Sequence, residues 1–529
     1  KVPDNTEPLV NVFSDPETGA TSVNIIIKQE PIPAKYKALG LYKAVNLSKD
    51  LMVSMLNERF SDAAKEPGSV FSAAGADYVQ LVTVMDGAYF YAMPKEGNGL
   101  ATVKELVKLI RQAGQYGFTQ DELDRAKTNL LRGYQSAADK AATRTNGQLA
   151  IQYVNYFLEQ EPYVDPVYEN EVVKQYVPQI TLQQLNMMIK SLITKENNII
   201  LYTCPKKDGV QVPTDAEVLS SYNDGYAAEV KPIAANAVNE PLLNASAVKG
   251  GKVKKEEAGF AGSKTWTLSN GLKVHLYPTD VQKDAIQFRL EQKGGKSILP
   301  MEVLPSFEEN VIAFYQQNAG VSKFSQSKLD KILAGKNVSA GNTVGPLTSG
   351  IVGSGSTKDF ETMMQLAYLY YTEPRCDAAE FENSMSQMKS IASNLGSNPD
   401  FRFSEENERV LNNNSPRFFF FGKDLLDKVS AANIKKGLDM LFSDAAGSEI
   451  YIAGDFKPEV IKPFVEQYLG ALPVKSKVAR KFVNHNMYMA PGMHEDVFEF
   501  DMKNPQTSAA IYYTGPIQNT KDNTIQLKA

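Results

Sequence analysis

Histidine is the residue type that most limits the chemistry of this sequence, because its 529 residues include only His275, His485 and His494. Two histidines one helical turn apart can bind zinc together, since side chains at positions i and i+4 project from one helix face. The closest pair here, His485 and His494, is nine positions apart, and neither H-E-x-x-H nor H-x-x-E-H occurs. We therefore expect no catalytic, cofactor-binding or metal-binding residue in this chain. We interpret His275 as a packing or surface residue of a strand, and the other two as surface residues.

One segment comes close to a phosphate-binding loop. Residues 350–357 (GIVGSGST) have suitably spaced glycines, but Ser356 stands where such a loop has its lysine. Without that lysine the β- and γ-phosphates lose their main positive partner. We interpret the segment as the end of a strand followed by a helix that Ser356 or Thr357 caps. A G-x-S-x-G motif, which would indicate a nucleophilic serine, does not occur in the sequence.

Four consecutive phenylalanines occupy residues 418–421. The expected place of such a run is the core, as a strand or at the edge of a sheet. An exposed run could instead bind an extended peptide, and the sequence leaves both alternatives open.

The composition is that of an ordinary globular protein. Hydrophobic residues make up 43% of the chain and charged residues 22%, which excludes a disordered, collagenous or disulfide-framework protein. Lys and Arg total 56 against 61 Asp and Glu, so the net charge of −5 offers no basic excess for a nucleic-acid partner. Cys204 and Cys376 are too few for a disulfide framework. No run of about 18 apolar residues indicates a transmembrane helix.

Strands and long helices follow one another along the chain. Apolar residues at helical spacing predict helices at 48–60, with Ser48 as N-cap, at 100–112 and at 458–472. A further helix begins at Thr119, where the sequence TQDE matches a capping box. Segments rich in β-formers predict strands at 22–27, 88–93, 198–202, 265–268, 273–277 and 450–453. Strands grouped with long helices on one side indicate an α+β layer rather than a doubly wound sheet.

We divide the chain into four parts by composition and pattern. They are a first domain at 1–204, a linker rich in Lys, Ala, Asn, Gly and Pro at 205–263, another domain at 264–480, and a linker with the start of a further domain at 481–529.

A weak internal repeat indicates that the chain belongs to a tandem duplication. Residues 15–25 resemble residues 504–511, since both run from an X-Pro turn through small residues into a β-rich segment. Residues 511–514 would be the first strand of a new domain. The sequence begins at Lys1 without an initiator methionine or a signal peptide, so we expect a processed or truncated piece of a longer protein.

Five segments together resemble one known family. They are residues 56–60 (LNERF), 118–127 (FTQDELDRAK), 267–274 (TLSNGLKV), 452–456 (IAGDF) and 465–473 (VEQYLGALP). In order and spacing they resemble the pitrilysin/insulinase-like zinc metallopeptidases, over nearly the whole chain outside the linker. By this resemblance the first two segments lie in helices of the family's second domain, the earlier of which carries an arginine. The other three open and close its third domain.

The resemblance implies a fold and a domain order. In that family a long chain holds two homologous halves of two domains each, which close like a clamshell around unfolded peptides. The fold class implied here is α+β, with repeated metallopeptidase-like domains, each an antiparallel-rich sheet packed with helices. The four parts would be the second, non-catalytic domain of the first half, the inter-half linker, a zinc-less third domain, and the start of a truncated fourth domain.

The resemblance assigns no catalytic residue to this chain. The family's H-x-x-E-H motif lies in the first domain, which is missing here. The matching residues 304–311 (LPSFEENV) contain no histidine, and Ser306 and Asn310 cannot replace two imidazoles as zinc ligands. The family's substrate-positioning arginine and tyrosine would lie beyond Ala529. Zinc is therefore expected in the full-length protein and not in this chain.

Two hypotheses about function follow from the resemblance. In the first, the chain is the non-catalytic portion of a zinc metalloendopeptidase, inactive alone, and forms part of a chamber for a peptide or unfolded polypeptide together with the missing N-terminal catalytic domain. In the second, it is an inactive structural or processing subunit of the same fold that pairs with an active protease subunit. A periplasmic or cell-envelope location is implied only by bacterial relatives.

Overall fold

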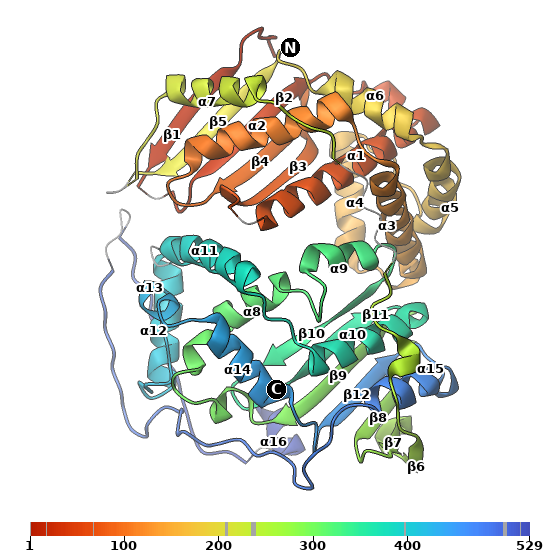
Figure 1. Cartoon of the computed structure of the whole chain (residues 1–529), viewed down its shortest axis with the longest axis vertical. Helices are drawn as coiled ribbons and strands as arrows, with labels where there is room; N and C mark the ends of the chain where they lie inside the picture. Colours follow the sequence, from red (N-terminus) through yellow and green to blue (C-terminus); the bar gives the residue numbers. More distant parts are fainter. Residues whose placement is uncertain are drawn as a thin grey trace.

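The computed structural model describes residues 2–16, 18–66, 68–206, 210–233, 240–395, 398–500, 505–518 and 520–528. In this part of the chain two β-sheets lie one above the other, each packed with helices (Figure 1). The upper sheet comes from the first half of the chain and the lower sheet from the second half. The fold class is α+β, as predicted from the sequence.

The first unit, as we call residues 2–227, is built on a five-stranded mixed sheet. Its strands are, in spatial order, β1 (Leu9–Asp15), β5 (Asn198–Pro205), β2 (Ser22–Gln29), β4 (Met85–Pro94) and β3 (Phe71–Val82). β1 and β5 are parallel, and the other neighbours are antiparallel. Its helices are α1 (Gly40–Lys65), α2 (Gly99–Tyr116), α3 (Gln120–Asp139), α4 (Asn146–Glu159), α5 (Pro166–Tyr176), α6 (Leu182–Leu192) and α7 (Asp215–Ala227).

The second unit, residues 253–472, is built on a seven-stranded sheet. Its strands are, in spatial order, β10 (Val338–Val344), β11 (Thr348–Gly355), β9 (Ile286–Lys293), β12 (Glu449–Gly454), β8 (Lys273–Pro278), β7 (Lys264–Leu268) and β6 (Val253–Ala258). Its helices are α8 (Glu309–Asn318), α9 (Gln326–Ile332), α10 (Phe360–Thr372), α11 (Ala378–Leu395), α12 (Pro399–Leu411), α13 (Lys423–Leu426), α14 (Ala431–Phe442) and α15 (Pro458–Phe464). The last helix, outside both units, is α16 (Lys521–Lys528).

The two sheets share one topology. The order β1-β5-β2-β4-β3 in the first corresponds to β8-β12-β9-β11-β10 in the second. In both, the parallel pair joins the first and last of these five strands in the chain, and the other pairs are antiparallel. A helix, α1 or α8, follows the second strand, and helices such as α2 or α10 follow the hairpin. The chain therefore contains the same α+β arrangement twice.

Each unit has a core between one face of its sheet and its helices. In the first unit, Val23, Ile25 and Ile27 alternate along β2 and are buried in one cluster with Leu51 of α1 and Val103 of α2. Fully burying a side chain of this size contributes about 1.5–3 kcal/mol. Because alternate residues of a strand point to opposite faces, the residues between them, such as Asn24, lie on the other face of the sheet, away from α1 and α2.

Most of the predicted elements are present with different ends. The six segments predicted as strands in the sequence correspond to β2, β4, β5, β7, β8 and β12 of the structure. Helix α1 begins at Gly40, so Ser48 is not its N-cap and instead donates its hydroxyl to the Ala44 carbonyl at 2.9 Å. The predicted capping box begins α3, with the Thr119 amide donating to the Glu122 carboxylate at 2.7 Å. The helix predicted at 458–472 is α15 followed by a π-helical turn at Val465–Leu469.

The segment predicted as a linker, residues 205–263, contains regular structure. Helix α7 begins with a capping box at Thr214 and buries Val218 and Tyr222 in the core of the first unit. Strand β6 pairs with β7 at the edge of the second sheet. The four domain boundaries remain predictions.

Two predicted strands do not form among the described residues. The phenylalanines at 418–421 are in a loop: Phe421 is buried, and the other three are half-buried. Residues 511–514 are also outside regular structure and are exposed, because no described strand pairs with them. β11 ends at Gly355 and a 3-10 turn leads into α10, as predicted, but the N-cap residue of α10 is Asp359, and neither Ser356 nor Thr357 caps the helix with its side chain. Lys1, Glu17, Asn504 and Ala529, on which parts of the repeat and boundary predictions rest, lie outside the described residues.

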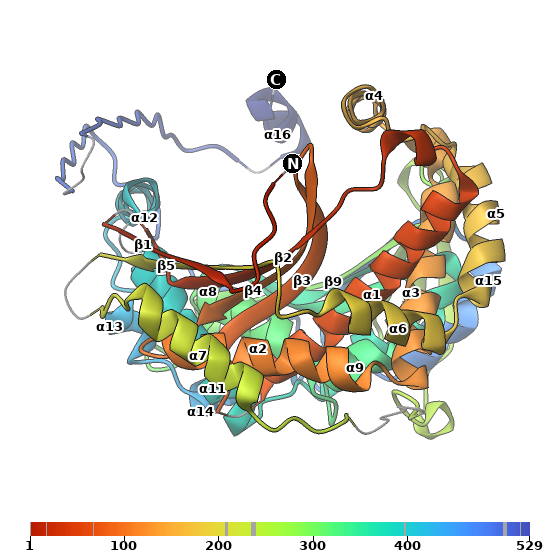
Figure 2. The ribbon, with the colours of Figure 1, turned by 90° about the horizontal axis from the view of Figure 1, so that it is seen from above.

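The helices of both units gather on the same side of the molecule. Seen from above (Figure 2), α2 and α7 of the first unit lie on one side together with α9, α11 and α14 of the second. Helices α4, α12 and α16 lie toward the opposite side. This arrangement leaves one face of each sheet for interactions with other molecules or other parts of a longer chain.

Candidate functional site

The uncovered face of the first sheet is apolar and aromatic. One row of neighbouring residues crosses all five strands on this face, namely Asn11, Leu201, Asn24, Tyr91 and Gly75. The Tyr91 ring covers Gly75, where a Cβ would lie only 2.6 Å from the ring, so a larger residue here would have to push the ring aside. The adjacent rows add Leu9, Phe13 and Met93, all of which are exposed. Such a surface can bind apolar side chains of an extended polypeptide.

The corresponding face of the second sheet carries aromatic and charged side chains. Its central row consists of Thr265, His275, Tyr451, Arg289 and Val352. A concavity of about 520 Å³ lies over this face between Arg289, Val352 and Tyr451. Burial raises the pKa of Tyr451. This face is therefore more polar than that of the first sheet.

His275, the histidine that we expected in a strand, lies in β8 on this face. Its Nε2 is 2.6 Å from Oε2 of Glu449, and its Nδ1 is 3.0 Å from the hydroxyl of Thr265. The imidazole stacks on Tyr451 with ring centroids 5.0 Å apart. Since both ring nitrogens have hydrogen-bond partners, His275 is held as a packing residue of the sheet surface.

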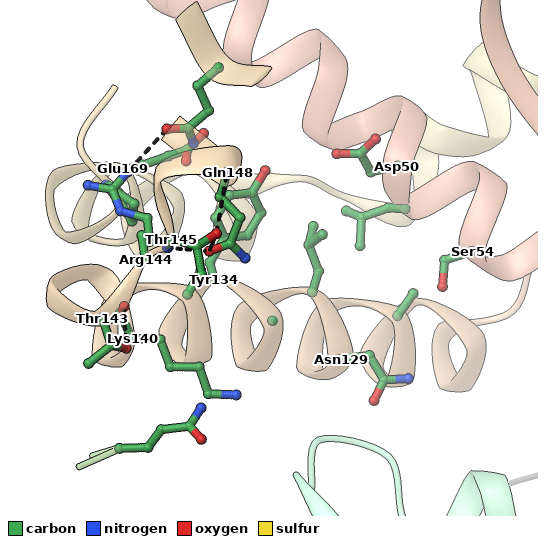
Figure 3. Close-up of a pocket in the computed structure, with 18 residues that line it drawn as sticks. Asp50, Ser54, Asn129, Tyr134, Lys140, Thr143, Arg144, Thr145, Gln148 and Glu169 are labelled. Atoms are coloured by element: carbon green, nitrogen blue, oxygen red, sulfur yellow. Dashed lines mark hydrogen bonds between the residues drawn. The ribbon is translucent and has the colours of Figure 1, made fainter. Parts of the chain in front are cut away.

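A cavity of about 820 Å³ lies between α1 and α3 (Figure 3). The α3 residues that line it include Ala126, Gly133 and Ala137, which are too small to fill the space between the helices. Figure 3 shows Asp50 and Ser54 of α1 over the helix that carries α3 residues such as Asn129. Small side chains therefore form part of the α3 wall of the cavity.

Polar groups gather at the end of this cavity nearest α4 and α5. Lys43 donates to the Tyr134 hydroxyl at 3.0 Å and to the Glu169 carboxylate at 2.5 Å. Burial lowers the pKa of Lys43, but these two partners outweigh burial and raise it overall. Burial also raises the pKa of Asp50. Arg144 donates to the Gln152 side chain at 3.1 Å. The cavity can therefore hold a ligand with both apolar and polar groups.

The two first-unit segments of the family resemblance contact each other through two ion pairs, of which one is buried. Arg59 of α1 makes a bidentate pair with Glu122 of α3, with N–O distances of 2.6 and 2.8 Å, and also donates to the Gly117 carbonyl. Next to it, Arg125 pairs with Glu58. Both Arg59 and Glu122 are buried. Arg59 therefore holds α1 against α3 and lies outside the residues that line the cavity.

Residues 304–311, which match the position of the family's zinc motif, do not fit a zinc ion. Leu304, Ser306 and Phe307 are buried in the core, and Ser306 accepts a hydrogen bond from the Ser430 amide. Glu308 caps α8 by accepting the backbone amides of Asn310 and Val311. No histidine lies among these residues. The chemistry of a zinc-bound water cannot be supplied from here.

The other two histidines bind backbone groups. Nε2 of His485 is 2.7 Å from the carbonyl oxygen of Ser297, and Nε2 of His494 is 2.9 Å from that of Ala490. Among the described residues, no group of three or more His, Cys, Asp or Glu side chains is placed to bind a metal ion.

No helix of the described chain is long and apolar enough to cross a membrane.

Sequence reasoning identified no site residue and missed the cavity between α1 and α3. Its one local signal was the spacing of Ala126, Gly133 and Ala137, which places three small residues along one side of a helix. That signal alone does not reveal a cavity, because small residues also allow close helix packing. The aromatic face of the first sheet was also missed, because it combines strands that are far apart in the sequence.

Comparison with known proteins relates the chain to one peptidase family. A family model described as the Peptidase M16 inactive domain matches residues 429–528. A protein named "Zinc protease PQQL-like" from Arabidopsis thaliana is 22% identical over 368 residues, which cover 69% of this chain and 36% of the relative. "Probable zinc protease PqqL" from Escherichia coli (strain K12) is 19% identical over 428 residues, which cover 80% of this chain and 45% of the relative. The chain thus spans less than half the length of these curated relatives.

A solved structure shares the fold. A point mutant of the ferredoxin protease FusC, in complex with Arabidopsis ferredoxin, superimposes with a TM-score of 0.58 at 14% identity, over 92% of this chain and 53% of that one. The family match and the two curated relatives make this chain similar to M16 peptidases. Its homologues in particular include zinc proteases of the PqqL kind.

Proposed function

We propose that this chain is the non-catalytic portion of a longer zinc metalloendopeptidase and forms part of the wall of a chamber that encloses a polypeptide substrate. The observation that carries the proposal is the pair of like-folded units whose helices gather on one side, so that the sheet faces are free on the other. The names of the curated relatives support the zinc protease class. The ferredoxin held by FusC supports a polypeptide as the substrate.

In this proposal the chain's own residues bind and position the polypeptide. Tyr91, Phe13 and Leu9 of the first sheet contact apolar side chains of the substrate and exclude water from them. Zinc, with its activated water and a glutamate general base, is supplied by a part of the protein that is not in this chain. The proposed periplasmic or cell-envelope location rests on the resemblance alone.

The test is polypeptide binding without cleavage. Fluorescence anisotropy measures binding of a reduced, carboxymethylated and labelled polypeptide to the purified chain, and electrophoresis of the mixture detects cleavage. We expect binding but no cleavage, and no stoichiometric zinc by elemental analysis. Replacing Tyr91 by Ser removes an aromatic contact of about 1–1.5 kcal/mol, so we expect Kd to rise by roughly five- to tenfold. Tyr168→Ser, at an exposed position of α5, is the control and leaves Kd unchanged.

Two results would overturn the proposal. One is a stoichiometric zinc signal that disappears when His485 and His494 are replaced together. The other is an equal loss of binding in the Tyr91 and Tyr168 variants. The gene sequence upstream of Lys1 distinguishes the proposed function from the alternative, in which the chain is an inactive subunit that pairs with an active protease. An H-x-x-E-H motif about 150–200 codons upstream supports the enzyme, since one domain has roughly this length.

A further inference from the structure

A second cavity, of about 750 Å³, lies in the second unit and is lined by aromatic side chains. It is bounded by the start of α8, by α12, by the loop after α12, and by a stretch of the C-terminal segment, residues 482–488. That stretch is fastened to Ser297, which accepts the Val483 amide through its hydroxyl at 3.0 Å. The aromatic residues around the cavity are Phe307, Phe401, Phe418, Phe419, Phe482 and Tyr488.

Two carboxylates, those of Glu308 and Glu405, are held at the wall of this cavity by the backbone. Glu308 accepts the amides of Asn310 at 3.0 Å and Val311 at 3.2 Å. Glu405 accepts the Phe421 amide at 2.5 Å. Despite these hydrogen bonds, burial keeps the pKa of each carboxyl raised. A carboxylate has about four acceptor positions, so both can accept further donors.

Three cations lie near these carboxylates: Arg417 is engaged by backbone carbonyls, Arg402 pairs with Glu405, and the charge of Lys296 acts on Glu308. Arg417 donates at 2.9 Å to the carbonyls of Lys296 and Leu299. Glu405 has an ion pair with Arg402 at 2.7 Å. The described residues that line the cavity include one lysine, Lys296, and one arginine, Arg417. They also include four glutamates, namely Glu308, Glu309, Glu405 and Glu408. The cavity therefore has an excess of negative charge next to aromatic rings.

We infer that this cavity is a subsite for a lysine or arginine side chain of the polypeptide, and this inference rests on the proposed function. The methylene groups of such a side chain pack on the rings of Phe418 and Phe419, and its cationic head donates to Glu308 and Glu405. A neutral side chain of the same length gains the apolar contacts but not the charge-assisted hydrogen bonds. The substrates favoured by this chain are then polypeptides with a basic residue in an apolar context.

The experiment compares two labelled peptides that differ only in charge. One carries a single arginine between apolar residues, and the other has citrulline at that position. Fluorescence anisotropy with the whole chain should give a Kd about tenfold lower for the arginine peptide. Glu405→Gln should weaken binding of the arginine peptide about tenfold and leave the citrulline peptide unchanged. Glu302→Gln, at an exposed glutamate that does not line the cavity, is the matched control.

Glu308→Gln provides a second variant, since it retains an oxygen that can cap α8. Circular dichroism of each variant shows whether the fold is intact. Equal Kd values for the two peptides, or an unchanged preference in both the Glu405 and Glu308 variants, would overturn the subsite and leave the proposed function standing. If neither peptide nor the unfolded polypeptide binds, the proposed function itself fails.

Discussion

The ion pair between Arg59 and Glu122 allows a sharp test of how the first unit is held together. The two residues join α1 to α3, and each side chain is only 6% exposed. Glu122 has a second role, because its carboxylate also accepts the Thr119 amide in the capping box of α3. Replacing Glu122 by Gln keeps an acceptor for that box and removes the negative charge. The change therefore isolates the buried charge pair.

The expected cost follows from burial. Removing one charge of a buried pair leaves the other without a counter-charge, which costs about 3–5 kcal/mol. Glu58→Gln is the matched control on the same two helices. Glu58 pairs with Arg125, and their side chains are 27% and 14% exposed, respectively. We therefore expect this variant to lose at most about 1 kcal/mol of unfolding free energy. The free energy of unfolding of the first unit should thus fall several times further in the Glu122 variant.

The position of the only tryptophan makes the assay specific. Trp266 is buried in β7 of the second unit, so its fluorescence follows the unfolding of that unit. Far-UV circular dichroism follows both units. In urea titrations we expect Glu122→Gln to move a circular dichroism transition to lower urea while the Trp266 transition stays near its original midpoint.

The same variant predicts a pH dependence. Burial acts to raise the pKa of Glu122, but the hydrogen bonds and charge of Arg59 outweigh it, so the pKa is lowered overall. A lowered pKa in the folded state means that this stabilisation is complete above the unfolded pKa of about 4.3 and is lost as pH falls through the folded value. The difference between the parent chain and Glu122→Gln should therefore shrink below about pH 4. A loss below about 1 kcal/mol at neutral pH, or one equal to that of Glu58→Gln, would refute the reasoning.

Three further substitutions test other contacts. Arg132 of α3 lies 3.4 Å from Asp284 and 3.6 Å from Asp359, both in the second unit. Arg132→Ala should therefore weaken the interaction between the two units by roughly 2–5 kcal/mol. The radius of gyration from small-angle scattering should rise, and an unchanged radius contradicts this prediction. A Cβ at Gly437 would lie 2.1 Å from the Phe307 ring, so Gly437→Ala should destabilise the second unit by about 1–3 kcal/mol, measured by Trp266 fluorescence in urea; an unchanged midpoint would show that the ring can move aside. Thr214→Ala removes the N-cap of α7 and should cost about 1 kcal/mol in the circular dichroism transition, whereas Thr214→Ser should restore most of it.

Much of the local structure could be predicted from the sequence, whereas the candidate sites could not. The Thr119 capping box and the apolar spacing of α2 involve residues within one or two helical turns, and they specify a helix wherever it lies. Helix α1 begins at Gly40, earlier than predicted. The prediction missed its first turns because they lack a clear apolar stripe. The phenylalanines at 418–421, expected in the core as a strand or at the edge of a sheet, lie in a loop in which Phe421 is buried, since apolar content alone does not decide between a strand and a buried loop.

The sequence by itself determined that no local zinc motif is present, because its three histidines are 210 and nine positions apart. It also determined the α+β class through the periodicity of its apolar residues. The tertiary structure decided which distant side chains meet. Arg59 reaches Glu122 only because α1 and α3 are adjacent, and Glu308 shares a cavity with Glu405 only because α8 and α12 are. Such contacts depend on the order of strands and the packing of helices, which single segments of the sequence do not encode.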